Sequence, residues 1–210
     1  MKIPAFTEAD VRRQLEAGRV TLDRGQHARL AQYLNSLVKW NRVYNLTGFR
    51  TSDALLERNL AESLELADRL HGELVADVGT GAGLPGIPLA IALPERTFTL
   101  IESRAKRVRF LRHVTGELGL ANVIIAHCRA EDLYPERPFD TVLARAVAAP
   151  AELLAIVRHL TARGSILLLS TSEETGAAYR GLAADFELRS IEPLPMSGHG
   201  AIVCVERVLA

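Results

Sequence analysis

The stretch LVADVGTGAGLPGIPLA, residues 74–90, decides the fold of this chain of 210 residues. It begins as a short apolar strand and continues into a loop with glycines at positions 79, 81 and 83, after which Pro85 or Gly86 opens a helix. Glycines let a ligand approach the backbone closely, and the start of a helix adds N–H groups that have no partner. A tight turn without a ligand is the alternative, but three alternating glycines at this position favour a ligand loop.

The loop is compatible with two kinds of ligand. Gly81-x-Gly83-x-x-Gly86 matches the dinucleotide fingerprint, and Glu102 follows at the distance expected for an acid that binds ribose. Asp77, at the end of the strand, favours S-adenosylmethionine instead. A carboxylate there would repel a pyrophosphate but suits the cationic amino group of a methionine moiety.

After residue 74, short apolar runs alternate with helical stretches, a pattern typical of βαβ units with a parallel sheet. Strands are expected at 74–78, 98–101, 123–126, 141–144 and 166–169, with helices near 85–92, 104–118, 150–162 and 173–184. The last two strand-like runs, 187–191 and 202–208, have no helix between them. We therefore expect an α/β, Rossmann-like sheet of seven strands whose last strand is antiparallel, which is unusual for a dinucleotide fold.

Before residue 71 the apolar spacing is helical. One stripe consists of Leu30, Tyr33, Leu34, Leu37, Val38 and Asn41, and a second, over 53–70, of Leu56, Leu60, Leu64 and Ala67. Thr51 or Ser52 would cap the second helix, and Gly72 would stop it. The chain is therefore expected to form an N-terminal helical cap, 1–70, and a sheet domain, 71–210.

The composition is that of an ordinary globular protein, with 48% apolar and 24% charged residues. No apolar run is long enough to cross a bilayer and the N-terminus does not resemble a secretion signal, so we expect a cytoplasmic monomer. Cys128 and Cys204 are expected to be reduced thiols. The six histidines do not form ligand pairs, and no metal site is expected.

Charge is distributed unevenly along the chain. Residues 1–50 carry nine Lys and Arg against four Asp and Glu, although the net charge of the whole chain is zero. The predicted helix near 104–118 carries five more cations: Arg104, Lys106, Arg107, Arg109 and Arg112. These charges indicate either a surface for a polyanion such as RNA or a solvated helix face. Trp40 and Tyr44, four residues apart, could stack on a base or belong to the core.

Four motifs resemble one known family in order and spacing. They are Trp40-Asn41-x-x-Tyr44-Asn45-Leu46-Thr47, Asp77-Val-Gly-Thr-Gly-Ala-Gly-Leu-Pro-Gly-Ile-Pro-Leu89, Glu102-Ser103-x-x-Lys106-Arg107-x-x-Phe110-Leu111 and Ala144-Arg145-Ala146. The chain resembles the bacterial small-subunit ribosomal RNA methyltransferases G (RsmG, or GidB). The resemblance implies a class I methyltransferase fold and transfer of a methyl group from S-adenosylmethionine to N7 of a guanine in 16S rRNA. The implied partner is 16S rRNA, free or in a partly assembled small subunit.

The expected cofactor site combines the loop with the ends of later strands. Its residues are Asp77, Gly79, Thr80, Gly81, Gly83, Leu84, Glu102, Ala130, Glu131 and Arg145. Glu102 can accept both ribose hydroxyls, and Glu131 or the backbone of Ala130 can meet the adenine.

The expected chemistry requires no general base, because guanine N7 already carries a free lone pair. The catalytic candidates are Arg145 and Asn45. Arg145 can hold guanine O6 or a phosphate through paired hydrogen bonds, or it can form an ion pair with a carboxylate such as Asp140. Asn45 and Thr47 can reach the same cleft, or they can cap a helix C-terminus.

The chain departs from the family pattern at two places. The family usually has Arg-His-x-x-Asp-Ser where this chain has Arg58-Asn59-Leu60-Ala61-Glu62-Ser63, and Lys-Gly where it has Ser170-Thr171-Ser172. The missing lysine removes a cation near the expected site. Two other functions stay open: an NAD(P)-dependent oxidoreductase, because of the dinucleotide-like loop, and a ribosome assembly factor that keeps the fold without catalysis, because of the missing lysine.

Overall fold

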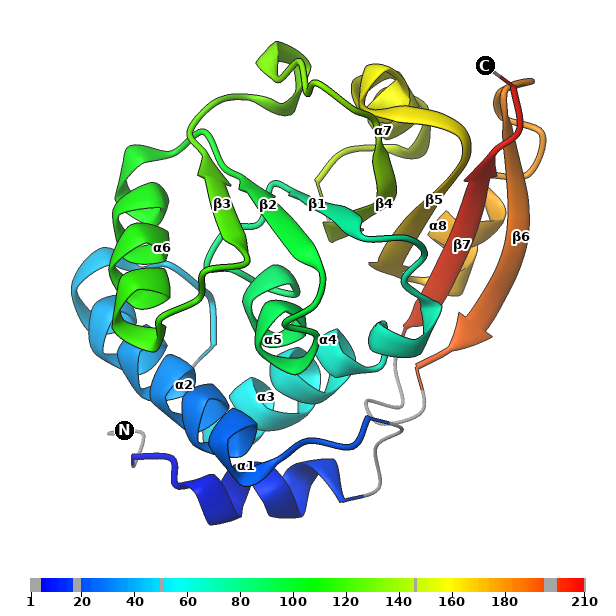
Figure 1. The fold of residues 1–210 in the computed structure, drawn as a ribbon. Helices are drawn as coiled ribbons and strands as arrows, with labels where there is room; N and C mark the ends of the chain where they lie inside the picture. The colour runs from blue at the N-terminus through cyan, green and yellow to red at the C-terminus, as the bar shows by residue number, and fades with distance from the viewer. Residues whose placement is uncertain (1–4, 17–19, 50, 146, 195–199, 210) are drawn as a thin grey trace.

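The computed structural model describes residues 5–16, 20–49, 51–145, 147–194 and 200–209. Its centre is a seven-stranded sheet with the strand order β3-β2-β1-β4-β5-β7-β6 (Figure 1). The strands are β1 (Leu74–Val78), β2 (Thr97–Ile101), β3 (Val123–Ala126), β4 (Phe139–Arg145), β5 (Thr161–Thr171), β6 (Phe186–Pro193) and β7 (Ala201–Arg207). β7 is antiparallel to β5 and β6, whereas the pairs among β1 to β5 are parallel. The predicted sheet with an antiparallel last strand is confirmed.

Helices cover both faces of the sheet. They are α1 (Glu8–Leu15), α2 (Arg24–Tyr44), α3 (Ser52–Leu55), α4 (Glu62–Leu64), α5 (Gly86–Ala92), α6 (Ala105–Leu118), α7 (Pro150–Val157) and α8 (Glu173–Ala177). Short 3₁₀ turns lie at Ala67–Arg69, Ala130–Asp132 and Arg158–Leu160. In the described part of the chain, we find no helix with the length and apolar character needed to span a membrane.

The helix expected over 53–70 is not continuous, and that prediction is wrong in detail. Thr51 caps its start as expected, but a π-helical turn, Leu56–Ala61, separates α3 from α4. The Asn59 side chain donates to the Ala54 carbonyl at 2.6 Å, and the Ser63 hydroxyl donates to the Asn59 carbonyl. Such bonds occupy carbonyls that a regular helix offers to its own amides, which apolar spacing cannot reveal.

Two hydrophobic clusters lie on opposite faces of the sheet. The larger cluster joins α2, through Leu30 and Leu34, to sheet residues such as Val75 and Leu100. The smaller cluster lies beneath α7 and α8. Because helices from the first 70 residues share the larger cluster with the sheet, they are packed onto it directly. The division into a cap, 1–70, and a domain, 71–210, stays a prediction.

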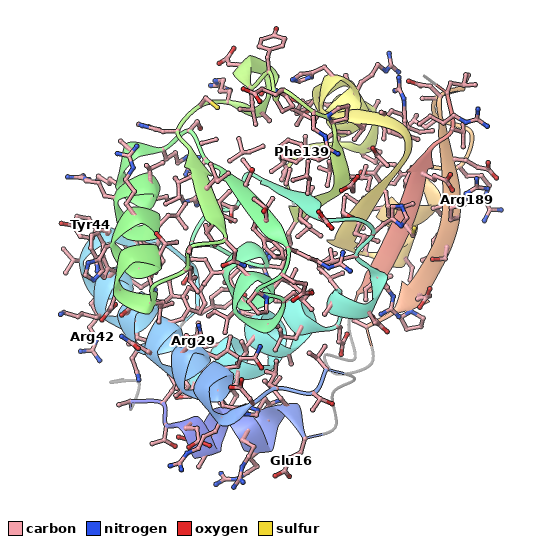
Figure 2. The ribbon with its side chains drawn as sticks, viewed as in Figure 1. Glu16, Arg29, Arg42, Tyr44, Phe139 and Arg189 are labelled. Carbon is pink, nitrogen blue, oxygen red and sulfur yellow. The ribbon has the colours of Figure 1, made fainter. Side chains whose placement is uncertain are left out.

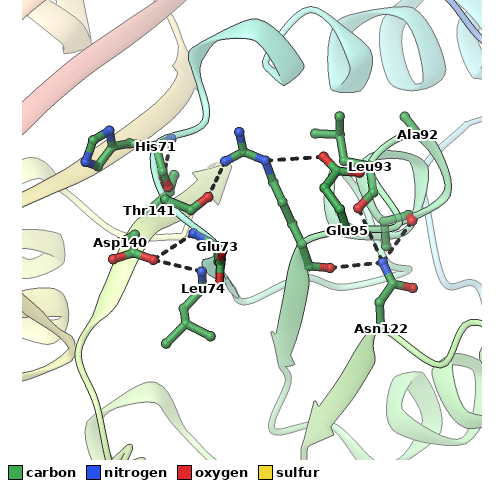
Figure 3. A network of polar contacts seen from close by, with 12 residues as sticks. His71, Glu73, Leu74, Ala92, Leu93, Glu95, Asn122, Asp140 and Thr141 are labelled. Carbon is green, nitrogen blue, oxygen red and sulfur yellow. Dashed lines mark hydrogen bonds and ion pairs between the residues drawn. The ribbon is translucent and has the colours of Figure 1, made fainter.

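Polar contacts fasten the amino ends of the first four strands (Figure 3). Asp140 accepts hydrogen bonds from the backbone amides of Glu73 and Leu74 at 2.8 and 2.9 Å. Thr141 exchanges hydrogen bonds with the backbone of His71, and Asn122 donates to one carbonyl in α5 and two that follow it. These bonds hold the starts of the strands in register with one another.

The strand order reverses between β1 and β4. β2 and β3 follow β1 on one side, while β4 and β5 lie on the other. In open α/β sheets, ligands bind beyond the carboxyl ends of the strands at such a switch point. The fold therefore predicts a ligand site at the carboxyl ends of β1, β2 and β4.

Candidate functional site

A cavity of about 500 Å³ opens beyond the carboxyl ends of β1, β2 and β4. Its lining consists of Val78, Gly79, Ile101, Glu102, Ser103, Arg104, Arg107, Cys128, Arg129, Ala130, Glu131, Arg145, Val147, Ala148, Glu152 and Ile156. This volume is typical of a site for a small ligand or cofactor. The predicted residues Gly79, Glu102, Ala130, Glu131 and Arg145 therefore lie around one cavity.

Asp77 lies beneath the glycine loop and holds it in shape. Its side chain is only 1% exposed, and its Oδ2 accepts hydrogen bonds from Thr80 Oγ1 at 2.6 Å and from the Gly86 amide at 2.9 Å. Burial outweighs these bonds and raises the pKa of Asp77 to about 6. Asp77 thus joins the end of β1 to the start of α5, and its proposed contact with a ligand amino group stays a prediction.

The glycines of the loop are required for two different reasons. Gly79, Gly81 and Gly83 have φ values of +64°, +64° and +89°, a region that favours glycine. Gly86 has ordinary helical dihedrals, but a Cβ there would lie 2.7 Å from Asp77 Oδ2 and against Leu100. Thr80, Gly81, Gly83 and Leu84 shape the loop without lining the cavity.

Glu102 is positioned by three donors at the end of β2. It is 4% exposed, yet it lines the cavity. Its Oε2 accepts from the Gly81 amide at 3.1 Å and from Arg107 Nη1 at 3.2 Å, while Oε1 accepts from the Arg104 amide at 2.8 Å. These bonds fix both carboxylate oxygens at the cavity wall, the place expected for an acid that accepts ribose hydroxyls.

A tyrosine from α2 supports the same loop. The Tyr33 hydroxyl, fully buried, donates to the Ala82 carbonyl at 2.8 Å. Burial raises the pKa of this phenol, so it remains a neutral donor. The first part of the chain thereby contacts the loop through a hydrogen bond that sequence patterns did not indicate.

Arg145 ends β4 and lines the cavity. Its Nη1 donates to Asn59 Oδ1 at 3.1 Å, not to a carboxylate. The expected alternative, an ion pair with Asp140, is wrong because Asp140 lies at the amino end of β4, where it binds backbone amides, and Arg145 lies at the carboxyl end. Asn59, at a position where the resembled family usually has a histidine, thus contacts a lining residue without lining the cavity itself.

Asn45 and Thr47 lie outside the cavity lining. Asn45 is the C-cap of α2 with φ 49° and ψ 52°, and its amide donates to the Asn41 carbonyl, so the capping alternative is confirmed. The Asn41 side chain in turn accepts from the Thr47 amide at 2.7 Å. A catalytic role for Asn45 stays a prediction.

Sequence patterns missed several lining residues. Ser103 lies in the loop after β2, and Cys128 and Arg129 lie in the loop after β3, positions that could have identified them. Glu152 and Ile156, four apart on α7, had no such signal, because nothing in the sequence shows which helix face meets the cavity. Burial raises the pKa of the Cys128 thiol, which is therefore a poor candidate for a nucleophile. Within the described ranges, no cluster of three potential metal ligands occurs.

Known proteins resemble this chain in sequence. The family model described as rRNA small subunit methyltransferase G (GidB) matches residues 26–200. A ribosomal RNA small subunit methyltransferase G from Aeromonas hydrophila subsp. hydrophila is 46% identical over 156 residues, 74% of this chain and 72% of the relative. Its counterpart from Serratia proteamaculans is 42% identical over 179 residues, 85% and 83% of the two chains.

Solved structures resemble this chain in fold. A SAM-dependent methyltransferase from Aquifex aeolicus aligns with a TM-score of 0.61 at 15% identity, covering 74% of this chain and 93% of the other. A mutant of MtNAS in complex with S-adenosylmethionine also gives 0.61 at 15% identity, covering 95% and 83%. The Rossmann-like methyltransferase fold expected from the sequence is confirmed.

Proposed function

Because the chain belongs to the rRNA small subunit methyltransferase G family, we propose that it transfers a methyl group from S-adenosylmethionine to N7 of a guanine in 16S rRNA. The observation that carries this proposal is the buried carboxylate of Glu102, fixed by three donors at the wall of the cavity beside the glycine loop. Acting as a monomer in the cytoplasm, the enzyme would use free or partly assembled small-subunit RNA.

Residues that line the cavity suit the nucleoside part of the cofactor, and a residue beneath the glycine loop suits its methionine part. Glu102 would accept the two ribose hydroxyls, and the backbone of Ala130 or the side chain of Glu131 would meet the adenine. Asp77, beneath the loop, would attract the amino group of the methionine part. The cofactor, when bound, supplies a methyl group activated by the positive charge on its sulfur.

The chain's own contribution to catalysis would be positioning. Guanine N7 has a lone pair in the neutral base, so no proton needs to be removed before attack. Arg145 would hold guanine O6 or a neighbouring phosphate from the cavity wall, and Asn45 would contact the target nucleotide. The target base must be unstacked to enter, which favours RNA that is not fully assembled.

Two measurements test this function. Tritium from labelled S-adenosylmethionine should enter deproteinised small-subunit RNA and be recovered as N7-methylguanine. By isothermal titration, S-adenosylhomocysteine should bind and NAD should not. Glu102→Gln should weaken binding about tenfold or more, because its amide would face donor groups, whereas the exposed control Glu173→Gln should not change it.

Two outcomes would overturn the proposal. Heat from NAD alone would indicate an oxidoreductase. Binding of S-adenosylhomocysteine without methyl transfer to free RNA or to partly assembled particles would indicate a non-catalytic assembly factor, consistent with Ser170-Thr171-Ser172 in place of the family's lysine.

A further inference from the structure

Helices α2 and α6 pack side by side and run in opposite directions. At one end of their contact, Ser36 Oγ of α2 donates to Glu117 of α6 at 2.7 Å. At the other end, the Arg109 guanidinium of α6 lies 6.0 Å from the ring centre of Tyr44 of α2. Trp40 lies between them, with its ring 5.2 Å from that of Tyr44. The last turns of α2 therefore lie beside the first half of α6.

The outer surface of this contact is almost purely basic. We define the α2–α6 seam by its exposed residues: Lys39, Arg42 and Tyr44 of α2, with Lys106, Arg109 and Arg112 of α6. α2 contains no acidic residue, and α6 contains one, Glu117, at the far end of the contact. Of these cations, Lys106, Arg109 and Arg112 form no ion pair with any residue that the structure describes. Figure 2 shows Arg42 and Tyr44 projecting on the outer side of the two helices.

An exposed aromatic ring lies within these cations. Tyr44 is 38% exposed and its neighbour Val43 is 70% exposed, although both are large apolar residues. Trp40 supports the Tyr44 ring from the core side, since the Trp40 ring also packs 5.6 Å from that of Phe110. A supported ring beside an arginine is the arrangement on which an unpaired base stacks.

The seam begins at the rim of the cofactor cavity. Arg104 and Arg107, at the start of α6, line the cavity, and Lys106 lies between them in sequence. At about 1.5 Å per residue, 106–112 extends about 9 Å along the helix, the length of two or three stacked nucleotides at about 3.4 Å each. A strand whose guanine enters the cavity can therefore continue directly along the seam.

We propose that the α2–α6 seam binds the RNA nucleotides next to the methylated guanine, with its cations on phosphates and Tyr44 against a base. This inference rests on the proposed function and adds to it the surface that holds the substrate. The cations alone would also suit an acidic protein segment. The exposed ring between them favours RNA, because a base offers a face for stacking and an acidic side chain does not.

The test compares two double variants that remove equal charge. Lys106→Gln with Arg112→Gln changes the seam, and Arg163→Gln with Arg180→Gln changes exposed cations on β5 and after α8. We expect the seam variant to raise the KM for deproteinised RNA roughly tenfold at 0.15 M salt. It should also reduce the slope of log binding constant against log salt by about 1.4, or about 0.7 for each phosphate contact. The kcat and the affinity for S-adenosylhomocysteine should not change, and the control pair should behave as the unchanged protein.

A separate change tests the stacking contact. Tyr44→Ala should weaken RNA binding about tenfold while leaving the salt slope unchanged, and Tyr44→Phe should restore it. Equal effects of the seam and control pairs, or an effect seen with ribosomal particles but not with free RNA, would overturn the proposal. Direct binding of RNA, measured without turnover, tests the seam even if no methyl transfer occurs. Failure of the seam proposal can therefore be distinguished from failure of the proposed function.

Discussion

The Arg145 guanidinium donates a hydrogen bond to the side-chain oxygen of Asn59 at 3.1 Å, across 86 positions of the chain. Asn59 is 0% exposed and is itself held by its bond to the Ala54 carbonyl. It lies in the π-helical turn, a distortion that often accompanies functional sites. Because the Asn59 acceptor is neutral, this bond does not offset the positive charge that Arg145 can present to an incoming base or phosphate.

Asn59→Asp should slow methyl transfer about tenfold or more. The new carboxylate has the same shape but pairs with Arg145 and neutralises its charge toward the substrate. Single-turnover transfer should reveal the loss, while titration with S-adenosylhomocysteine shows nearly unchanged affinity. Ser63→Ala removes another bond of the same turn and should lower stability only. Unchanged transfer in Asn59→Asp would remove Asn59 and Arg145 from the reaction.

Asp77→Asn should change how stability depends on pH. A carboxyl group whose pKa is about 6 when folded, against 3.8 when unfolded, binds more protons in the folded chain. Its stabilising contribution is complete below pH 4 and is lost as the pH rises through 6, by up to about 3 kcal/mol. The variant has no such group and keeps an acceptor for Thr80 and Gly86. Between pH 4 and 7, its free energy of unfolding should therefore rise relative to that of the unchanged protein. Urea unfolding at several pH values measures this difference, and a constant difference would contradict it.

The same variant should bind the cofactor product less well above pH 6. Only the ionised carboxylate of Asp77 attracts the amino group, so the affinity of the unchanged protein for S-adenosylhomocysteine should rise as the pH increases through about 6. In Asp77→Asn, this rise should be absent. A parallel rise in both proteins would assign the effect to another group.

Gly86→Ala should damage the loop, and Gly119→Ala should not. The added methyl group at position 86 would lie 2.7 Å from Asp77 Oδ2, a close contact that costs about 1–3 kcal/mol and displaces the carboxylate. At position 119, the methyl group meets open space, and the positive φ costs only about 1 kcal/mol. Thermal unfolding and titration with S-adenosylhomocysteine should separate the two, with affinity reduced about tenfold or more in Gly86→Ala alone. Equal affinities would show that the loop tolerates this shift.

Tyr33→Phe should destabilise the glycine loop by removing its hydrogen bond to α2. The Ala82 carbonyl loses its donor in a buried place, which costs about 1–3 kcal/mol of the free energy of unfolding. A less ordered loop should also lower the affinity for S-adenosylhomocysteine a few-fold. Tyr179→Phe, beneath the other face of the sheet, is the matched control and should leave affinity unchanged. Equal losses of affinity in the two variants would contradict this role.

The sheet could be predicted from the sequence because its strands are short, apolar and separated by helices. Leu74–Val78 and Val123–Ala126 have the predicted bounds, and the missing helix between the last two runs correctly indicated the antiparallel hairpin. Residues 195–199 of that connection lie outside the described part of the chain. Glu102 could be found because its place at a strand end is a property of the local sequence.

Contacts between distant segments could not be predicted in this way. The pairing of Asn59 with Arg145 and of Tyr33 with Ala82 depends on how the helices pack on the sheet, and no local pattern encodes that packing. The π-helical turn was missed for a related reason, because the side-chain bonds of Asn59 and Ser63 leave the apolar spacing unchanged.

The larger hydrophobic cluster links the susceptibility of the N-terminal helices to proteases with the stability of the sheet. Since α2 shares this cluster with β1 and β2, local opening of the helices would uncover the apolar face of the sheet. A ligand in the cavity stabilises the folded chain, so opening of the helices should become rarer and trypsin should cleave them more slowly. This protection should extend to Lys39 and Arg42, exposed cleavage sites outside the cavity lining. A fragment starting at residue 71 would lack its cover and should aggregate rather than fold.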